Sequence, residues 1–244
     1  CLEGNSLGRL PRATIDVVNR YLTAEWGNRL VDGWNDWIDE AQSTGDLIGR
    51  AALGAGPGQV LAVDTTSVNF YQLCHAAVRA RPGRRKVITD RANFPTDRYI
   101  LEGLCDDLDL DLIYIDDETG EEFVTPTALA DVVDNDTALV TLSVIQYRSG
   151  ALHRIPELTE IARKAGALFV WDASHAVGVV PMAFDRDGVD LAVGCTYKYG
   201  NSGAGSPAWL YVRSSIQDEL EVPIQGWFAQ RDQFAMSHGF DRAR

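Results

Sequence analysis

Short apolar runs alternate with amphipathic stretches along most of this chain. The runs are rich in β-branched and aromatic residues, which predicts buried strands at 59–64, 86–89, 111–116, 138–144, 167–172, 191–195 and 207–212. Residues 125–135 and 155–166 instead repeat apolar positions at helical spacing, and Pro156 and Gly166 are typical of a helix start and stop. This alternation favours an α/β fold with a mostly parallel central sheet and helices on both faces.

The first fifty residues follow a different, mostly helical pattern and carry Trp26, Trp34 and Trp37. We therefore expect an N-terminal helical segment at 1–50 and a large α/β domain at 51–244. The chain begins inside a motif-like stretch and stops at Arg244 without a closing element, which predicts a piece of a longer protein.

Charge and composition narrow the classes of partner. The 244 residues include 35 acids and 22 bases, for a formal net charge of −13, which argues against nucleic acid or an anionic membrane. No apolar run approaches the roughly 20 residues that a membrane span needs. The four cysteines and four histidines lack metal-ligand spacing, so we expect no metal and a reduced, cytoplasmic setting.

Candidate chemistry lies just after the predicted strands, where open α/β sheets bind ligands. Taken singly, each side chain has an ordinary role, such as a helix cap, a core ring or a solvated amine. Taken together, they offer an acid, an amine, hydroxyls and an aromatic ring, which are the needs of one cofactor. The residues are Thr66, Ser67, Phe94, Asp97, Ser143, Asp172, His175, Tyr197 and Lys198.

That cofactor is pyridoxal 5'-phosphate, which needs an amine for a Schiff base and a carboxylate for its pyridine nitrogen. Lys198 follows the apolar run VDLAVGC, where an unpaired ammonium is costly, so we expect its amine to be held in an imine. Asp172 offers the carboxylate. Backbone N–H groups and hydroxyls at the helix start of Thr66 and Ser67 suit a phosphate, and Phe94 offers a flat neighbour for the ring.

Five motifs, GNSLG, NFPTD, WDASHAVG, CTYKY and GWF, occur in the order and at about the spacing seen in kynureninases. From Gly4 to Met236 the chain resembles that family, a branch of the fold-type-I, aminotransferase class V group. The resemblance implies a PLP-dependent transferase-like fold and a homodimer acting on a small amino-acid substrate. It also implies hydrolytic Cβ–Cγ cleavage of L-kynurenine or 3-hydroxykynurenine to anthranilate or 3-hydroxyanthranilate and L-alanine, in tryptophan catabolism.

The resemblance assigns the reacting groups and the phosphate site. Lys198 would be the Schiff-base lysine and general base, and Asp172 the partner of the pyridine nitrogen. The phosphate would be bound by Thr66, Ser67 and Tyr197.

The remaining positions would surround the ring and the substrate. Phe94 would stack on the cofactor, Asp97 and Ser143 would hold its polar edge, and His175 would lie beside it. Trp227 of GWF would contact cofactor or substrate across a dimer interface.

Two further residues, Trp34 and Ser6, would lie on the substrate side.

The family reads Asp-Leu-Ala-His where this chain reads DASH at 172–175, a change that leaves the acid and the histidine intact. A small C-terminal domain, with the arginine for the substrate carboxylate, is expected beyond Arg244.

Three alternatives stay open. GNSLG at 4–8 also fits the G-x-S-x-G elbow of serine hydrolases, which needs a strand before it and a helix after it. A related class V lyase or desulfurase would share the acid and the lysine, but a desulfurase needs a mobile nucleophilic cysteine. An inactive scaffold that still binds pyridoxal phosphate is the non-enzymatic alternative.

Overall fold

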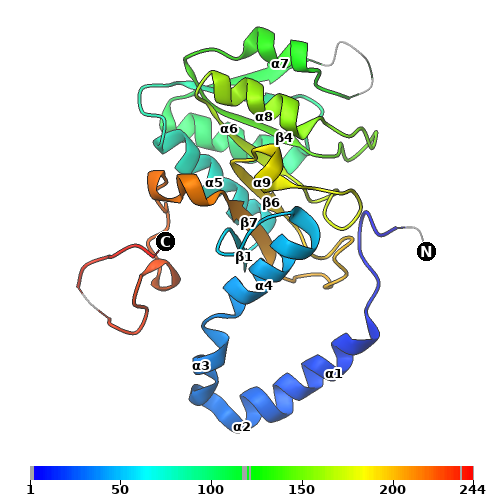
Figure 1. Ribbon diagram of the computed structural model, residues 1–244, viewed down its shortest axis with the longest axis vertical. Coiled ribbons are helices and arrows are strands. Elements are labelled where there is room, and N and C mark those ends of the chain that lie inside the picture. The colour runs from blue at the N-terminus through cyan, green and yellow to red at the C-terminus, as the bar shows by residue number, and fades with distance from the viewer. Residues whose placement is uncertain (1–2, 117–119, 121, 237, 244) are drawn as a thin grey trace.

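A computed structural model of the chain describes residues 3–116, 120, 122–236 and 238–243. Within them, seven strands form one mixed sheet in the order β1-β7-β6-β5-β4-β2-β3 (Figure 1). The strands are β1 Val60–Val63, β2 Lys86–Asp90, β3 Asp111–Ile115, β4 Thr137–Ser143, β5 Leu168–Asp172, β6 Leu191–Gly194 and β7 Ala208–Val212.

Strand direction decides where functional side chains gather. β2 pairs in parallel with β3 and β4, and β5 with β4 and β6. β7 is antiparallel to both of its neighbours, β6 and β1, so β1 runs the same way as the parallel strands. Six strands therefore end at one edge of the sheet, which is where a doubly covered α/β sheet binds ligands.

Helices cover both faces of the sheet (Figure 1). The side chains of β5 alternate between two cores, with Leu168 and Val170 in one and Phe169 and Trp171 in the other. The first core includes residues of α5 and α6, and the second includes residues of α7, α8 and α9. These helices are α5 Thr66–Arg79, α6 Pro95–Leu108, α7 Pro126–Val132, α8 Ile155–Lys164 and α9 Phe184–Asp187. The predicted fold class is confirmed.

The N-terminal segment is a helical arm that extends from the sheet (Figure 1). Its elements are α1 Arg12–Arg20, η1 Tyr21–Trp26, α2 Gly27–Arg29, η2 Leu30–Gly33, α3 Trp34–Trp37, α4 Glu40–Ile48 and η3 Gly49–Leu53. α4 packs closely against β1. A Cβ on Gly45 would lie only 2.0 Å from the Val60 carbonyl oxygen, so only glycine fits at this position. The helical stretch runs through residue 50, and the domain division there stays a prediction.

After β7 the chain carries two 3-10 turns, η4 Ser214–Glu219 and η5 Trp227–Ala229. Among the residues that the structure describes, no helix is long and apolar enough to cross a lipid bilayer.

Candidate active site

The common edge of the parallel strands brings the predicted site residues together. Ser143 at the end of β4 pairs in register with Asp172 at the end of β5. Lys198 follows β6, in the loop that leads to β7, and Phe94 lies just after β2, at the start of α6. Ser143, Asp172 and Lys198 are all buried, so this edge holds polar groups that must find partners inside the protein.

Lys198 is buried, with 7% of its surface exposed, and its amine is hydrogen-bonded to a neutral group. Its Nζ lies 2.8 Å from Nε2 of His175 and 5.5 Å from the centre of the Phe94 ring. Burial lowers the pKa of His175, and the nearby Lys198 amine lowers it further. His175 is therefore neutral, and its Nε2 accepts a hydrogen bond from the Lys198 amine. No described carboxylate forms an ion pair with that amine within 4.0 Å.

Two buried carboxyl groups, those of Asp97 and Asp172, are neighbours at the site. Burial raises the pKa of Asp97 well above its usual range, and the neighbouring Asp172 raises it further by its charge and by a hydrogen bond between the two side chains. Both causes favour the protonated form of Asp97. Asp172 also accepts a 2.8 Å hydrogen bond from the backbone N–H of Ser174. The second oxygen of Asp97, Oδ2, has no described partner.

The start of α5 has free backbone donors. Thr65 is the N-cap, and its hydroxyl accepts from the Val68 N–H at 3.3 Å. Thr66 and Ser67 are the first two residues of the helix, where backbone N–H groups have no carbonyl partner within the helix. The direction of β1 places this helix start at the same edge of the sheet as Lys198.

Two side chains at the site were missed by the sequence analysis. Asn93 is buried and bridges elements, because its Oδ1 accepts from the Ser143 hydroxyl at 2.7 Å and from the Phe94 N–H at 2.9 Å. Tyr147 packs edge-on against Phe94, with ring centroids 5.3 Å apart. Asn93 opens the NFPTD motif, so the motif itself could have drawn attention to it. Tyr147 carries no such sequence signal.

The predicted substrate-side residues lie in the arm and in the C-terminal segment. Trp34 of α3 and Trp227 of η5 are in edge-on contact, with ring centroids 5.4 Å apart, although 193 positions separate them in the chain. Trp227 also contacts Phe228 and Phe234. The roles of Trp34 and Trp227 toward a ligand stay predictions.

Ser6 does not occupy a nucleophile elbow. It is exposed in a turn, where its N–H donates to the Glu3 carbonyl at 2.9 Å. No described strand leads into Gly4–Gly8, and the next helix begins only at Arg12. The serine-hydrolase alternative is therefore wrong, because the strained strand-to-helix turn that exposes such a serine is not formed.

The donor set fits pyridoxal phosphate. Lys198 offers an amine next to an aromatic face, and Asp172 offers a buried carboxylate. The orphaned Oδ2 of Asp97 indicates that a polar partner belongs beside it, since buried polar atoms are seldom left unpaired. The free N–H groups at Thr66 and Ser67 suit a phosphate.

Comparison with curated proteins finds kynureninases. That of Burkholderia pseudomallei (strain 1106a) is 40% identical over 248 residues, which covers 98% of this chain and 58% of that protein. That of Pseudomonas fluorescens is 38% identical with the same coverage. The chain thus spans 58% of the length of these relatives.

Comparison with solved structures finds the same fold at low identity. A cysteine desulfurase from Thermococcus onnurineus NA1 has a TM-score of 0.82 at 19% identity, covering 99% of this chain and 60% of the other. The cystine C-S lyase C-DES has a TM-score of 0.77 at 16% identity, covering 93% and 61%. The aminotransferase class-V family model matches residues 51–234, which is more than half of the chain. The chain therefore belongs to the aminotransferase class-V family.

Proposed function

We propose that this chain is part of a kynureninase, which hydrolyses the Cβ–Cγ bond of L-kynurenine or 3-hydroxykynurenine in tryptophan catabolism. The cleavage adds the hydroxyl of water to the γ-carbonyl carbon and a proton to Cβ, giving anthranilate or its 3-hydroxy form and L-alanine. The observation that carries the proposal is the buried Lys198 amine beside His175 and Phe94, in a chain 40% identical to a kynureninase.

Pyridoxal phosphate, when bound, supplies an electron sink for negative charge that develops at the α-carbon of the substrate. In the proposed site Lys198 would bind its carbonyl carbon and Asp172 would pair with its pyridine nitrogen. Thr66, Ser67 and Tyr197 would bind the phosphate.

Other side chains would hold the ring of the cofactor. Phe94 would pack on its face and Ser143 would lie at its polar edge. Asp97 keeps its proton, because burial and the charge of Asp172 both raise its pKa. It can therefore donate a hydrogen bond beside Asp172, which would pair with the pyridine nitrogen. Two neighbouring ionised carboxylates would repel each other.

Lys198 is the proposed proton acceptor, and His175 is the residue that positions its amine. Lys198 would remove the α-proton as general base, because its buried amine is held in one direction by His175. His175 is neutral and accepts a hydrogen bond from the amine at 2.8 Å, so it orients Nζ and stabilises the amine after it has taken a proton.

The desulfurase alternative is disfavoured by the described cysteines. Cys74, Cys105 and Cys195 are all buried, at 0%, 3% and 1% exposure, and burial raises the pKa of each thiol. A protonated, enclosed thiol is a poor nucleophile. Cys1 lies outside the described residues. The solved cysteine desulfurase shares the fold at 19% identity, which carries no activity to this chain.

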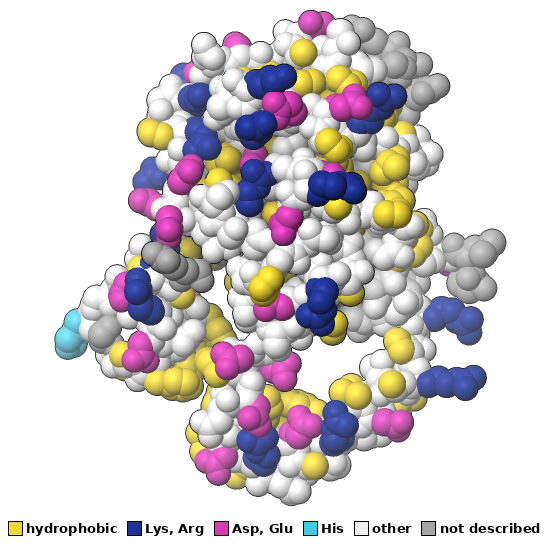
Figure 2. Space-filling view, in the orientation of Figure 1, with side chains coloured by type: hydrophobic (Ala, Val, Ile, Leu, Met, Phe, Trp, Pro, Cys, Tyr) yellow, Lys and Arg dark blue, Asp and Glu magenta, His cyan; other side chains and the backbone are white. Residues whose placement is uncertain are grey.

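A second copy of the chain is the proposed protein partner. Helix α1 buries none of its own residues, and Ile15, Val17 and Val18 are about half exposed, at 54%, 47% and 48%. Figure 2 shows apolar side chains along the arm and over the adjoining C-terminal segment. An apolar surface of this extent favours association. A monomeric mass for the full-length protein in light scattering would contradict this part of the proposal.

The decisive experiment is to incubate full-length protein and cofactor with L-kynurenine and 3-hydroxykynurenine, following anthranilate by fluorescence and alanine by chromatography. The matched control is Lys164→Ala, a surface lysine, against Lys198→Ala. We expect activity in the wild type and the control and its loss in Lys198→Ala. Cofactor binding without cleavage of either substrate would refute the proposed activity, and sulfide release from cysteine would favour a desulfurase.

A further inference from the structure

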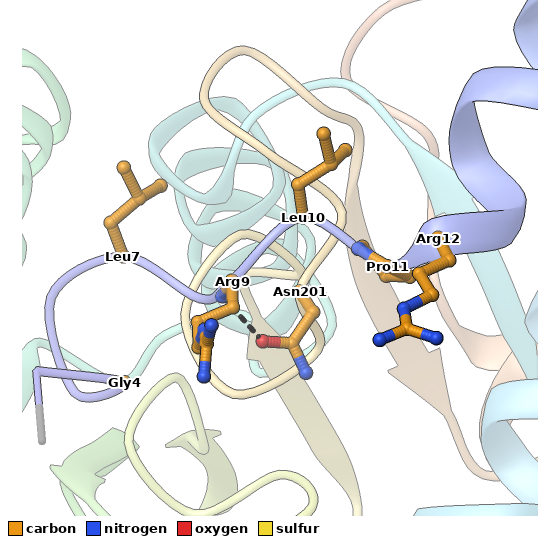
Figure 3. Close-up of a pocket in the computed structure, with 7 residues that line it drawn as sticks. All are labelled: Gly4, Leu7, Arg9, Leu10, Pro11, Arg12 and Asn201. Carbon is orange, nitrogen blue, oxygen red and sulfur yellow. Dashed lines mark hydrogen bonds between the residues drawn. The ribbon is translucent and has the colours of Figure 1, made fainter. Parts of the chain in front are cut away.

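The N-terminal residues 4–9, which we call the strap, lie directly on the loop that carries Lys198. The backbone N–H of Gly8 donates to the Tyr197 carbonyl at 2.8 Å. The N–H of Arg9 donates to Oδ1 of Asn201 at 2.8 Å, across 192 positions of sequence (Figure 3). At the other end of the strap, a Cβ on Gly4 would lie 3.1 Å from the Tyr199 ring.

Gly8 is the point of closest approach. A Cβ built on it would lie 2.2 Å from the Lys198 carbonyl oxygen, 2.3 Å from Asn201 Oδ1 and 2.7 Å from Asn201 Cα. Real Cβ atoms do not approach heavy atoms this closely, and two of the three atoms are backbone. Any larger residue must therefore push the strap and the Lys198 loop apart. Gly8 is needed here for its size, since its φ does not lie in the left-handed region.

Asn201 ties the strap to the loop. It adopts the left-handed conformation, with φ of 57°, which asparagine tolerates better than most residues. Its N–H donates to the Lys198 carbonyl at 3.2 Å, and its Nδ2 donates to the Tyr199 carbonyl at 3.0 Å. The other polar atom of its side chain, Oδ1, accepts from the backbone N–H of Arg9. One residue thus connects the turn after Lys198 with the strap.

The strap has few other attachments. Most of its residues are exposed, and a hollow of about 600 Å³ opens beside it, lined by Leu7, Arg9, Leu10 and Asn201 among others (Figure 3). Its position therefore depends on the contacts with the Lys198 loop. The loop is glycine-rich and has no regular secondary structure, so the strap contacts add to the few hydrogen bonds within the loop, such as that between the Thr196 and Ser206 hydroxyls.

We propose that the strap is a positioning element for Tyr197 and Lys198, with Gly8 in the strap and Asn201 in the loop as the positioning residues. This role rests on the proposed function of Lys198. It also explains the GNSLG sequence without any chemistry from Ser6. Its last glycine, Gly8, lets the backbone of the strap contact the backbone of Tyr197 and Lys198.

The test compares Gly8→Ala with the control Gly103→Ala in the full-length protein. Gly103 is exposed on α6, and a Cβ there meets nothing within 4 Å. Three quantities are measured: cofactor affinity by absorbance titration, amide exchange over 196–203 in the cofactor-free protein, and kcat with KM. We expect Gly8→Ala to weaken cofactor binding at least about tenfold and to speed exchange only in 196–203. We expect kcat to fall by up to about a hundredfold, since misplacing a reacting group by about 1 Å has that effect.

A second pair of variants keeps the test sharp if Gly8→Ala does not fold. Asn201→Gly retains the left-handed backbone but removes Oδ1, whereas Asn201→Asp retains that acceptor. We expect the affinity loss and faster exchange in the glycine variant, and values within about threefold of wild type in the aspartate variant. Wild-type exchange and affinity in Gly8→Ala, or equal behaviour of the two Asn201 variants, would overturn the proposal. If kynurenine is not cleaved at all, exchange and affinity still decide the role of the strap.

Discussion

Replacing Asn93 by alanine tests whether the polar network beneath the site is a structural unit. The Asn93 side chain is 1% exposed and makes three hydrogen bonds. Its Oδ1 accepts from the Ser143 hydroxyl at 2.7 Å and the Phe94 N–H at 2.9 Å, and its Nδ2 donates to the Thr89 hydroxyl at 3.1 Å. Removing the Asn93 side chain leaves the buried hydroxyls of Ser143 and Thr89 and the part-buried Phe94 N–H without these partners.

The expected cost follows from those contacts. A buried hydrogen bond contributes about 1 kcal/mol net, and a donor left unsatisfied costs about 1–3 kcal/mol. Three lost bonds therefore lower the free energy of unfolding by about 3 kcal/mol, and by about 5 kcal/mol if no water enters. A typical domain is stable by about 5–15 kcal/mol, so the variant should fold with a clearly reduced margin. Because Phe94 and Ser143 lose their common anchor, cofactor affinity should fall as well.

Guanidinium unfolding followed by tryptophan fluorescence measures the first effect, and absorbance titration measures the second. The matched control is Asn35→Ala, since Asn35 is exposed and makes one side-chain bond, to the Asp32 carbonyl at 3.2 Å. We expect that control to change stability by less than about 0.5 kcal/mol. A double-mutant cycle with Ser143→Ala should give a coupling of about 1 kcal/mol between Asn93 and Ser143.

Stability of Asn93→Ala within about 0.5 kcal/mol of wild type would refute the argument, as would additive effects in the cycle. Either result would mean that the network is not needed to hold the end of β4 against the start of α6.

Other predictions test the remaining assignments. Borohydride reduction of the loaded protein should fix the cofactor to Lys198, and recovery of the label on Lys86 or Lys164 by peptide mapping would contradict that role. Asp172→Asn should retain cofactor absorbance but lower kcat by about 10²- to 10³-fold, as does loss of other positioned electrostatic groups, and a near-normal kcat would exclude the assignment. Burial lowers the pKa of His153, whose Nδ1–H donates to the Ser143 carbonyl and whose Nε2 accepts from the Val124 N–H. Folding favours the neutral form of His153. Its contribution to the free energy of unfolding is therefore complete above about pH 6.5 and is lost as the pH falls below that value. Relative to His153→Gln, the wild type should therefore lose stability between pH 7 and pH 5 in denaturant titrations, and parallel pH profiles would contradict this.

The fold was predictable because its strands are short buried runs with clear boundaries. β4, β5 and β6 lie within a residue of the predicted ends, since every residue in them is buried and most of their side chains are apolar. The predicted helix at 125–135 is shorter, α7 ending at Val132, because Val133 is already extended. Local sequence could not place that end, as it depends on where the chain turns into β4.

The clustering of the candidate site residues was predictable to the extent that strand ends meet at one edge. Ser143, Asp172 and Lys198 follow from that rule together with the resemblance. The proton on Asp97 and the neutral His175 do not, because both depend on burial and on neighbours from other strands. Asn93 was missed for the same reason: its role exists only once β2 and β4 lie side by side.

The strap and the Lys198 loop are almost 200 positions apart in the chain. They are held together mainly by a few contacts that involve the backbone. A contact of such range forms only after the sheet has brought the two segments together. Exposed, sparsely attached segments also open at lower free energy than the packed core. The buried strands thus fix where the site is, whereas its least stable part sets how accurately Tyr197 and Lys198 are held. We therefore expect conditions that loosen the arm to reduce cofactor affinity before they unfold the sheet, with amide exchange at 196–203 rising ahead of exchange in β4 and β5.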